Sequence, residues 1–249
     1  IRDSLHRLEN VALFVGSGGG FGPCDPEYDR LVKMGRIVEI DKRVKQFIMR
    51  YADGIIVNVG AELDTMFSRM DNGRIRWYNV DMPETMELRR RMLESKDREQ
   101  NIGKSILDFT WLDSVKKNQG EAILFVCCDV TKYFTTKKLQ AFLDAIWQRF
   151  PGAEVLFDVK NSVGRKQANL KVLTGKKKGS FIKVSIDNCT SLMYDWNIKY
   201  RVLYDRAILN KEDIADMFSD DVARRYRHAI RRKYDKIIQL RLGTERIRF

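Results

Sequence analysis

The segment Gly54–Gly60 (GIIVNVG) constrains the fold more than any other part of the chain. It is a short apolar run rich in β-branched residues and closed by glycine, which is typical of a strand buried on both faces of a parallel sheet. Similar runs predict six further strands, at Ile75–Val80, Gly103–Leu107, Ala122–Cys127, Glu154–Val159, Tyr200–Tyr204 and Lys236–Leu242. The sequence therefore predicts a seven-stranded sheet.

Helical patterns lie between the predicted strands. Apolar residues at helical spacing form one stripe before the first strand and another before the fifth: Val44, Phe47, Ile48 and Tyr51, and Leu139, Phe142, Leu143, Ile146 and Phe150. Strands that alternate with helices indicate right-handed crossovers and a doubly wound, mostly parallel α/β sheet. The last two strands are joined by a helical stretch, Lys211–Tyr234, and could form a different kind of edge.

Composition favours one large domain, because 249 residues with 44% hydrophobic and 32% charged content can bury a single α/β core. No apolar run approaches the roughly 18 residues that span a bilayer, and the first residues lack the plan of a secretion signal. We therefore expect a cytoplasmic protein. The polar, basic stretch Lys160–Ser180 predicts an insertion at the rim of the sheet, helical at most from Lys166 to Leu173.

The cysteines and histidines argue against a metal site or a disulfide framework. The four cysteines (Cys24, Cys127, Cys128 and Cys189) show no C-x-x-C spacing, and the two histidines are His6 and His228. Neither histidine follows a predicted strand, so we name no general base. Cys127 and Cys128 close a buried strand and are interpreted as small apolar residues rather than nucleophiles.

The net charge of +12 leaves a nucleic-acid partner open. The positive charge is, however, spread over several predicted elements, Arg89–Arg91, Lys176–Lys178 and Arg224–Lys233. No single basic stripe with interleaved exposed aromatic residues emerges as an RNA track. We interpret the excess as general surface charge.

The loop after the first strand indicates the kind of ligand. Doubly wound sheets bind ligands beyond the carboxyl ends of their strands. Here the loop Gly60–Thr65 has one glycine and carries Glu62 and Asp64, whereas a pyrophosphate site would need G-x-G-x-x-G. An acidic loop suits a cationic cofactor that has no phosphate.

Two further acids follow the next two predicted strands. Asp81 comes 21 residues after Gly60, where a carboxylate can accept hydrogen bonds from both hydroxyls of a ribose. Asp108 follows the third predicted strand, where it could accept from an adenine amino group while the amide of Phe109 reaches a ring nitrogen. Each acid could also be a helix cap, but together they predict an adenosine site.

At these residues the chain resembles a known family. Ile56–Thr65 (IVNVGAELDT) is similar to the signature VN-(L/I)-G-A-G-L-D-T of the leucine carboxyl methyltransferase family, which includes polyketide O-methyltransferases and a tRNA wybutosine-modifying methyltransferase. Four other segments resemble family motifs: Gly35-Arg36, Tyr78–Pro83 (YNVDMP), Ile106–Phe109 (ILDF) and Ile123–Phe134 (ILFVCCDVTKYF). The resemblance covers about Met34 to Val159 well and the remainder in outline.

The resemblance implies a Rossmann-like class I fold that binds S-adenosylmethionine and releases S-adenosylhomocysteine. Arg36, placed before a helix predicted over Asp41–Arg50, would hold the carboxylate of the cofactor. The full set of implied cofactor-binding residues is Arg36, Gly60, Ala61, Glu62, Asp64, Asp81, Met82, Asp108, Phe109, Cys128 and Asp129.

Two positions depart from the family pattern. Glu62 stands where the family has glycine, and Cys128 stands where it has a glutamate. If that glutamate holds the ammonium group of the cofactor, Asp129 or Glu62 could replace it. In the family, the region before Arg36 covers the cofactor, so we predict a lid over residues 1–35 and a methyltransferase domain over 36–249.

The predicted reaction is methyl transfer to a carboxylate or hydroxyl oxygen of a small molecule or peptide. Two alternatives stay open. The basic charge favours a tRNA-modifying methyltransferase, and the departures at Glu62 and Cys128 favour a degenerate relative that binds the cofactor without catalysis.

Overall fold

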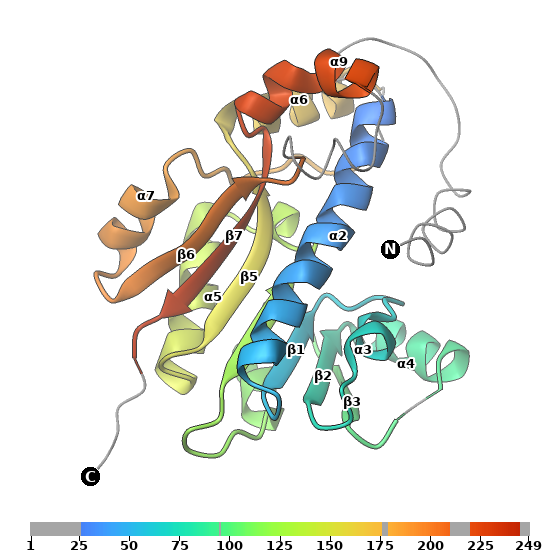
Figure 1. The fold of residues 1–249 in the computed structure, drawn as a ribbon, viewed down its shortest axis with the longest axis vertical. Helices are drawn as coiled ribbons and strands as arrows, with labels where there is room; N and C mark the ends of the chain where they lie inside the picture. The colour runs from blue at the N-terminus through green and yellow to red at the C-terminus, as the bar shows by residue number, and fades with distance from the viewer. Residues whose placement is uncertain (1–25, 95, 176–178, 210–219, 245–249) are drawn as a thin grey trace.

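The computed structural model in Figure 1 describes residues 26–94, 96–175, 179–209 and 220–244. A seven-stranded sheet runs through it in the order β3-β2-β1-β4-β5-β7-β6. The strands are β1 (Ile55–Val59), β2 (Arg76–Asp81), β3 (Glu99–Gly103), β4 (Ile123–Cys127), β5 (Glu154–Lys160), β6 (Tyr200–Ala207) and β7 (Asp235–Leu242).

The first five strands are parallel, whereas β7 pairs antiparallel with both β5 and β6. The predicted doubly wound, mostly parallel sheet is confirmed, and the last two strands do form a different edge. Strand order reverses between β1 and β4, which place their carboxyl ends side by side. This is the switch point at which such sheets bind ligands.

Helices cover both faces of the sheet. They are α2 (Pro26–Arg50), α3 (Met66–Met70), α4 (Pro83–Met92), α5 (Thr136–Arg149), α6 (Ser162–Leu173), α7 (Cys189–Trp196) and α9 (Asp220–Arg231), with 3-10 turns η1 (Phe109–Ser114) and η2 (Thr131–Tyr133). None of the described helices combines the length and apolarity needed to cross a membrane.

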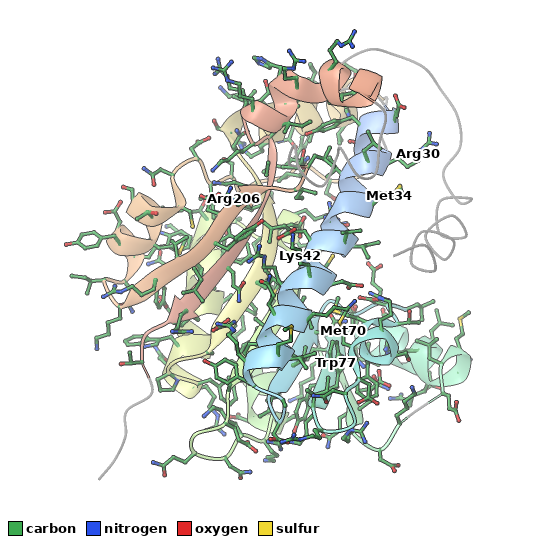
Figure 2. All side chains as sticks on the ribbon, in the orientation of Figure 1. Arg30, Met34, Lys42, Met70, Trp77 and Arg206 are labelled. Atoms are coloured by element: carbon green, nitrogen blue, oxygen red, sulfur yellow. The ribbon has the colours of Figure 1, made fainter. Side chains whose placement is uncertain are left out.

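Alternating side chains of the central strands divide the core into two layers. Ile56, Leu124 and Leu156 face α2, α3 and α9, while their neighbours face η1, α5 and α7. Figure 1 shows α2 crossing one face of the sheet, and Met70 and Trp77, labelled in Figure 2, are buried in this α2-facing layer. Period-two burial on both faces explains the continuous apolar runs of the sequence.

The helix before β1 is much longer than predicted. It begins at Pro26 rather than Asp41, so Gly35 and Arg36 lie inside it and not before it. Gly35 lets the helix pack closely against Leu209, because a Cβ at this position would lie 2.9 Å from Cδ2 of that side chain. Of the predicted lid, residues 26–35 form the first turns of α2, and residues 1–25 lie outside the described part of the chain.

The third strand lies four residues earlier in the chain than predicted. It spans Glu99–Gly103 instead of Gly103–Leu107, because this edge strand is polar and only partly buried. The apolar residue Ile106 packs against the core from the loop that follows. Asp108 therefore comes five residues after the strand and not at its end.

Two differences concern the second half of the chain. Helix α6 starts at Ser162, capped by the side chain of Asn161, four residues before the predicted start at Lys166. Helix α7 was not predicted. Lys176–Lys178 and the first part of the predicted helix, residues 211–219, lie outside the described residues, as do His6 and Cys24.

Candidate cofactor site

The loop after β1 makes a turn that requires glycine at its first position. Gly60 has φ +72°, and a Cβ there would lie 2.5 Å from Cγ2 of Val130. Glu62, at the position where the family pattern has glycine, keeps the left-handed backbone with φ +43°. The loop thus retains a backbone that suits glycine while carrying an exposed carboxylate side chain.

Asp81 ends β2 and lies against this turn. Its Oδ2 accepts a hydrogen bond from the amide of Glu62 at 2.9 Å, and its Oδ1 accepts from the amide of Met82 at 2.7 Å. Each carboxylate oxygen has a second lone pair, so Asp81 can accept two further hydrogen bonds from a ligand. The structure therefore brings Asp81 beside the Gly60 turn, as the sequence predicts.

A buried arginine that the sequence analysis missed fastens the same loop. Arg89 in α4 donates to the carbonyl oxygens of Glu62 at 3.2 Å and Asp64 at 2.7 Å, and to Oε1 of Glu99 at 2.8 Å. It is 3% exposed, so the interpretation of Arg89 as surface charge was wrong. Its spacing of three residues from the buried Met86 was a usable signal, because both lie on one face of the helix.

Arg36 faces two carboxylates. Its Nη1 lies 3.0 Å from Oδ1 of Asp129, and its Nε lies 3.1 Å from Oδ2 of Asp158. Burial alone would lower the pKa of Arg36, but the negative charges of Asp158 and Asp129 outweigh burial and raise this pKa. The Nε–H is not aligned on Asp158, and among the described residues it has no hydrogen-bond acceptor.

Asp158 is a second functional candidate that the sequence analysis missed, because it lies within a buried strand. Its Oδ1 accepts a hydrogen bond of 2.6 Å from the amide of Asp129. Burial raises the pKa of Asp158, and the nearby Arg36 counteracts this effect. Asp129 itself has φ +59°, which aspartate tolerates better than most residues, and its Oδ2 accepts from Lys132 at 2.5 Å.

The two cysteines at the end of β4 suit packing rather than chemistry. Burial raises the pKa of the Cys127 thiol and of the half-buried Cys128 thiol, which disfavours the reactive thiolate. Cys128 faces the same side of the sheet as Arg36, as the α2-facing core indicates. Its thiol cannot supply the negative charge of the family glutamate.

Other predicted residues take structural roles in this geometry. Asp64 pairs with Arg69 at 3.1 Å. Asp108 caps η1: its Oδ1 accepts from the hydroxyl and the amide of Thr110, and these hydrogen bonds lower the pKa of Asp108. The segment leading to Asp108 leaves the same end of the sheet as Asp81, since the amide of Lys104 donates to the Asp81 carbonyl at 2.9 Å.

Phe109 and Ala61 complete the placement of the predicted residues. Phe109 is half-buried, with its ring centroid 6.1 Å from that of Phe142, and Ala61 is buried in the turn after β1. Met82 precedes α4 and is exposed. The predicted residues thus gather around the carboxyl ends of β1, β2 and β4, apart from Asp108 and Phe109, which lie farther along the chain from β3.

The site fits a cofactor with an adenosine end and an amino-acid end. Asp81 retains acceptor capacity for a ribose, and Arg36 and the partly exposed Asp129 form an ion pair whose two charges match the carboxylate and the ammonium of an amino acid. In the part of the chain that the structure describes, no group of three or more His, Cys, Asp or Glu residues is placed to hold a metal ion.

One cavity among the described residues lies away from these side chains. It has a volume of about 750 Å³, and its lining includes Lys116 from the loop before β4, Arg149 at the end of α5 and Lys199 directly before β6. These three segments lead into the amino ends of β4, β5 and β6. The cavity is therefore at the end of the sheet opposite to Asp81.

Comparison with known proteins finds a family model that matches part of the chain. Residues 30–147 match the model for leucine carboxyl methyltransferase. This match covers just under half of the chain, and over it the chain is similar to the family. Its members are S-adenosylmethionine-dependent methyltransferases, and the matched region contains Arg36, the Gly60 turn, Asp81 and Asp129.

A relative of known role matches the same region. The tetracenomycin polyketide synthesis O-methyltransferase TcmP of Streptomyces glaucescens is 28% identical over 124 residues, which are 49% of this chain and 45% of the relative. The matched part therefore spans less than half the length of that relative.

Solved structures share the fold at low sequence identity. The magnesium protoporphyrin IX methyltransferase ChlM from Synechocystis PCC 6803, with bound S-adenosylhomocysteine, has a TM-score of 0.55 and 11% identity; the alignment covers 96% of this chain and 93% of that one. A DUF574 family protein from Streptomyces avermitilis has a TM-score of 0.59 and 8% identity, with coverage of 84% and 82%. These likenesses, with the strand order, establish the Rossmann-like class I methyltransferase fold.

Proposed function

We propose that the chain binds S-adenosylmethionine and transfers its methyl group to an oxygen atom of a small-molecule acceptor. The observation that carries this proposal is the position of Asp81. It ends β2, contacts the Gly60 turn through the amide of Glu62, and keeps free lone pairs for both ribose hydroxyls.

The proposed contacts divide into two groups. The adenosine end would be held by Asp81, Met82, Asp108, Phe109 and the loop of Gly60, Ala61, Glu62 and Asp64. The amino-acid end would be held by the charged side chains of Arg36 and Asp129, with the half-buried Cys128 beside them. Asp129 is the better candidate than Glu62 for the partner of the ammonium, because the Asp129 carboxylate lies 3.0 Å from Arg36, the proposed partner of the ligand carboxylate.

The protein contributes mainly by placing two reactants in line. When bound, S-adenosylmethionine supplies a methyl group activated by a cationic sulfur. Orientation alone can account for much of the rate of such a displacement. A carboxylate acceptor needs no general base, which agrees with the described residues: His228, their one histidine, lies exposed on α9 beside Tyr234.

The role of TcmP in polyketide synthesis supports a small-molecule acceptor with oxygen as the methylated atom. Treatment of the methylated product with mild base distinguishes a carboxylate oxygen from a hydroxyl oxygen. Methyl esters are cleaved by mild base, whereas aryl methyl ethers are not.

The test is incubation with methyl-labelled S-adenosylmethionine and three kinds of acceptor: aromatic polyketide phenols, small carboxylic acids and bulk tRNA. We expect label in a phenol or an acid and none in tRNA, and we expect Asp81→Ala to remove most of it. Label in tRNA that depends on Asp81 would replace the small-molecule proposal with the RNA alternative. Tight cofactor binding without transfer to any acceptor would favour the non-catalytic alternative.

A further inference from the structure

Asp158 occupies a position where three elements meet. It lies in β5 on the side that faces α2, two residues after the buried Leu156. Its neighbour across the sheet is Ile237 in β7. A buried carboxylate in an apolar layer is costly unless it is paired, so its partners define its role.

Those partners come from the two segments that frame the amino-acid end of the proposed site. Oδ1 of Asp158 accepts from the Asp129 amide at 2.6 Å, and Oδ2 lies 3.1 Å from Nε of Arg36. The carbonyl oxygen of Asp158 also accepts from the hydroxyl of Thr131 at 2.5 Å. One residue thus joins α2 to the loop after β4.

The two carboxylates at Arg36 are not equivalent. The side chain of Asp158 is 10% exposed, whereas that of Asp129 is 44% exposed and also pairs with Lys132. An exposed ion pair contributes little and can be exchanged, while a buried one is costly to break. Asp158 is therefore the fixed partner of Arg36, and Asp129 is the exchangeable one.

The wider surroundings of the pair are also charged. Asp235 in β7 acts electrostatically on both Arg36 and Asp158, but its own carboxylate is held by the hydroxyl of Tyr28 at 3.0 Å and by Lys160. The Asp235 carboxylate thus has Tyr28 and Lys160 as its partners and not Arg36. It provides a matched control, since it is a buried aspartate on a neighbouring strand with partners of its own.

We propose that Asp158 is a positioning residue for the amino-acid end of the cofactor. It holds Arg36 from one side and the backbone of Asp129 from the other. A ligand carboxylate can then replace the Asp129 side chain at Arg36, and the released Asp129 carboxylate can accept from the ligand ammonium. This inference rests on the proposed function, because it concerns the same site.

A positioning role differs from a general structural role in which part of the ligand it affects. Loss of a scaffold residue would weaken the whole cofactor. Loss of a residue that orients Arg36 and Asp129 would weaken only ligands that carry the amino-acid group. S-adenosylhomocysteine has this group, and 5′-methylthioadenosine has the same adenosine without it.

The experiment is calorimetric titration of the wild type, Asp158→Asn and Asp235→Asn with both ligands. For Asp158→Asn we expect the affinity for S-adenosylhomocysteine to fall by roughly tenfold or more, as befits hydrogen bonds to charged groups, with 5′-methylthioadenosine affected less than twofold. For Asp235→Asn we expect both affinities to stay near wild type. Thermal denaturation establishes that each variant is folded.

Asp158→Glu provides a second variant that keeps the charge but displaces it by one methylene. We expect the same selective loss, since position as well as charge is required. Equal weakening of both ligands, or no weakening of either, would overturn the positioning role while leaving the proposed function intact. A wild type that binds neither ligand would instead overturn the proposed function itself.

Discussion

The loops after β1 and β4 both border the proposed cofactor site, yet they are held in different ways. Backbone groups hold the loop after β1: its carbonyl oxygens accept from the buried Arg89, and its Glu62 amide donates to Asp81. Charged side chains hold the loop after β4, where Asp129 contacts both Arg36 and Lys132.

The difference indicates how the two ends of the site would respond to a ligand. The partners of the first loop are internal and complete, so this loop keeps its shape whether or not a ligand is bound. In the second loop the buried Asp158 holds the backbone of Asp129, but the Asp129 side chain lies in a partly exposed ion pair that a zwitterionic ligand can replace. Removing the buried Arg89 that holds the first loop should therefore reduce stability, and removing the Asp129 carboxylate of the second should reduce affinity.

The largest expected effect comes from Arg89→Met. It removes a buried charge that joins α4, β3 and the loop after β1 and leaves Glu99 buried without that partner. We expect the free energy of unfolding to fall by about 3–5 kcal/mol, measured by urea denaturation. Arg91→Met, on the exposed side of the same helix, should unfold near the wild-type midpoint. Equal midpoints for the two variants would contradict the role of Arg89.

An intermediate effect is expected at the loop after β4. Asp129→Asn should weaken S-adenosylmethionine by roughly tenfold, because it removes the proposed charge partner of the ammonium. Cys128→Ala should change the affinity little, since the protonated thiol carries no charge. Calorimetric titration measures both. Loss of methyl transfer in Cys128→Ala would show instead that the thiol takes part in the chemistry.

The smallest effect, and one of opposite sign, is expected for Glu62→Gly. Glycine adopts the observed φ of +43° without strain, so we expect the variant to be more stable by about 1 kcal/mol in urea denaturation. Cofactor affinity should remain within about twofold of wild type if Asp129 holds the ammonium. A marked loss of affinity would assign that role to Glu62.

Local patterns were enough to predict the parts of the site that depend on chain direction and turn geometry. The β-branched run before Gly60 and the acid that ends the next strand are each encoded within a few residues, so the turn and Asp81 lie where expected. The same applies to the sheet, because strands buried on both faces produce continuous apolar runs. The position of the edge strand β3 was predicted wrongly because this strand is polar and partly exposed.

Pairings between distant segments could not be predicted in this way. Asp158 is 122 residues from Arg36 along the chain, and Arg89 is 27 residues from Glu62. No local period distinguishes such buried charges from surface ones. The position of Arg36 within α2 was missed for a related reason, since Gly35 favours a break and only packing against Leu209 explains its place in a helix.

Calorimetric titration with S-adenosylhomocysteine tests the central claim most directly, using the wild type, Asp81→Ala and Asp53→Ala. Asp53 is an exposed aspartate whose partner is the surface residue Arg74, so its replacement controls for charge alone. We predict that the wild type binds one equivalent, that Asp81→Ala weakens binding by roughly 10- to 100-fold, and that Asp53→Ala has no effect. A wild type that does not bind, or binding that Asp81→Ala leaves unchanged, would contradict a cofactor site at the carboxyl ends of β1 and β2.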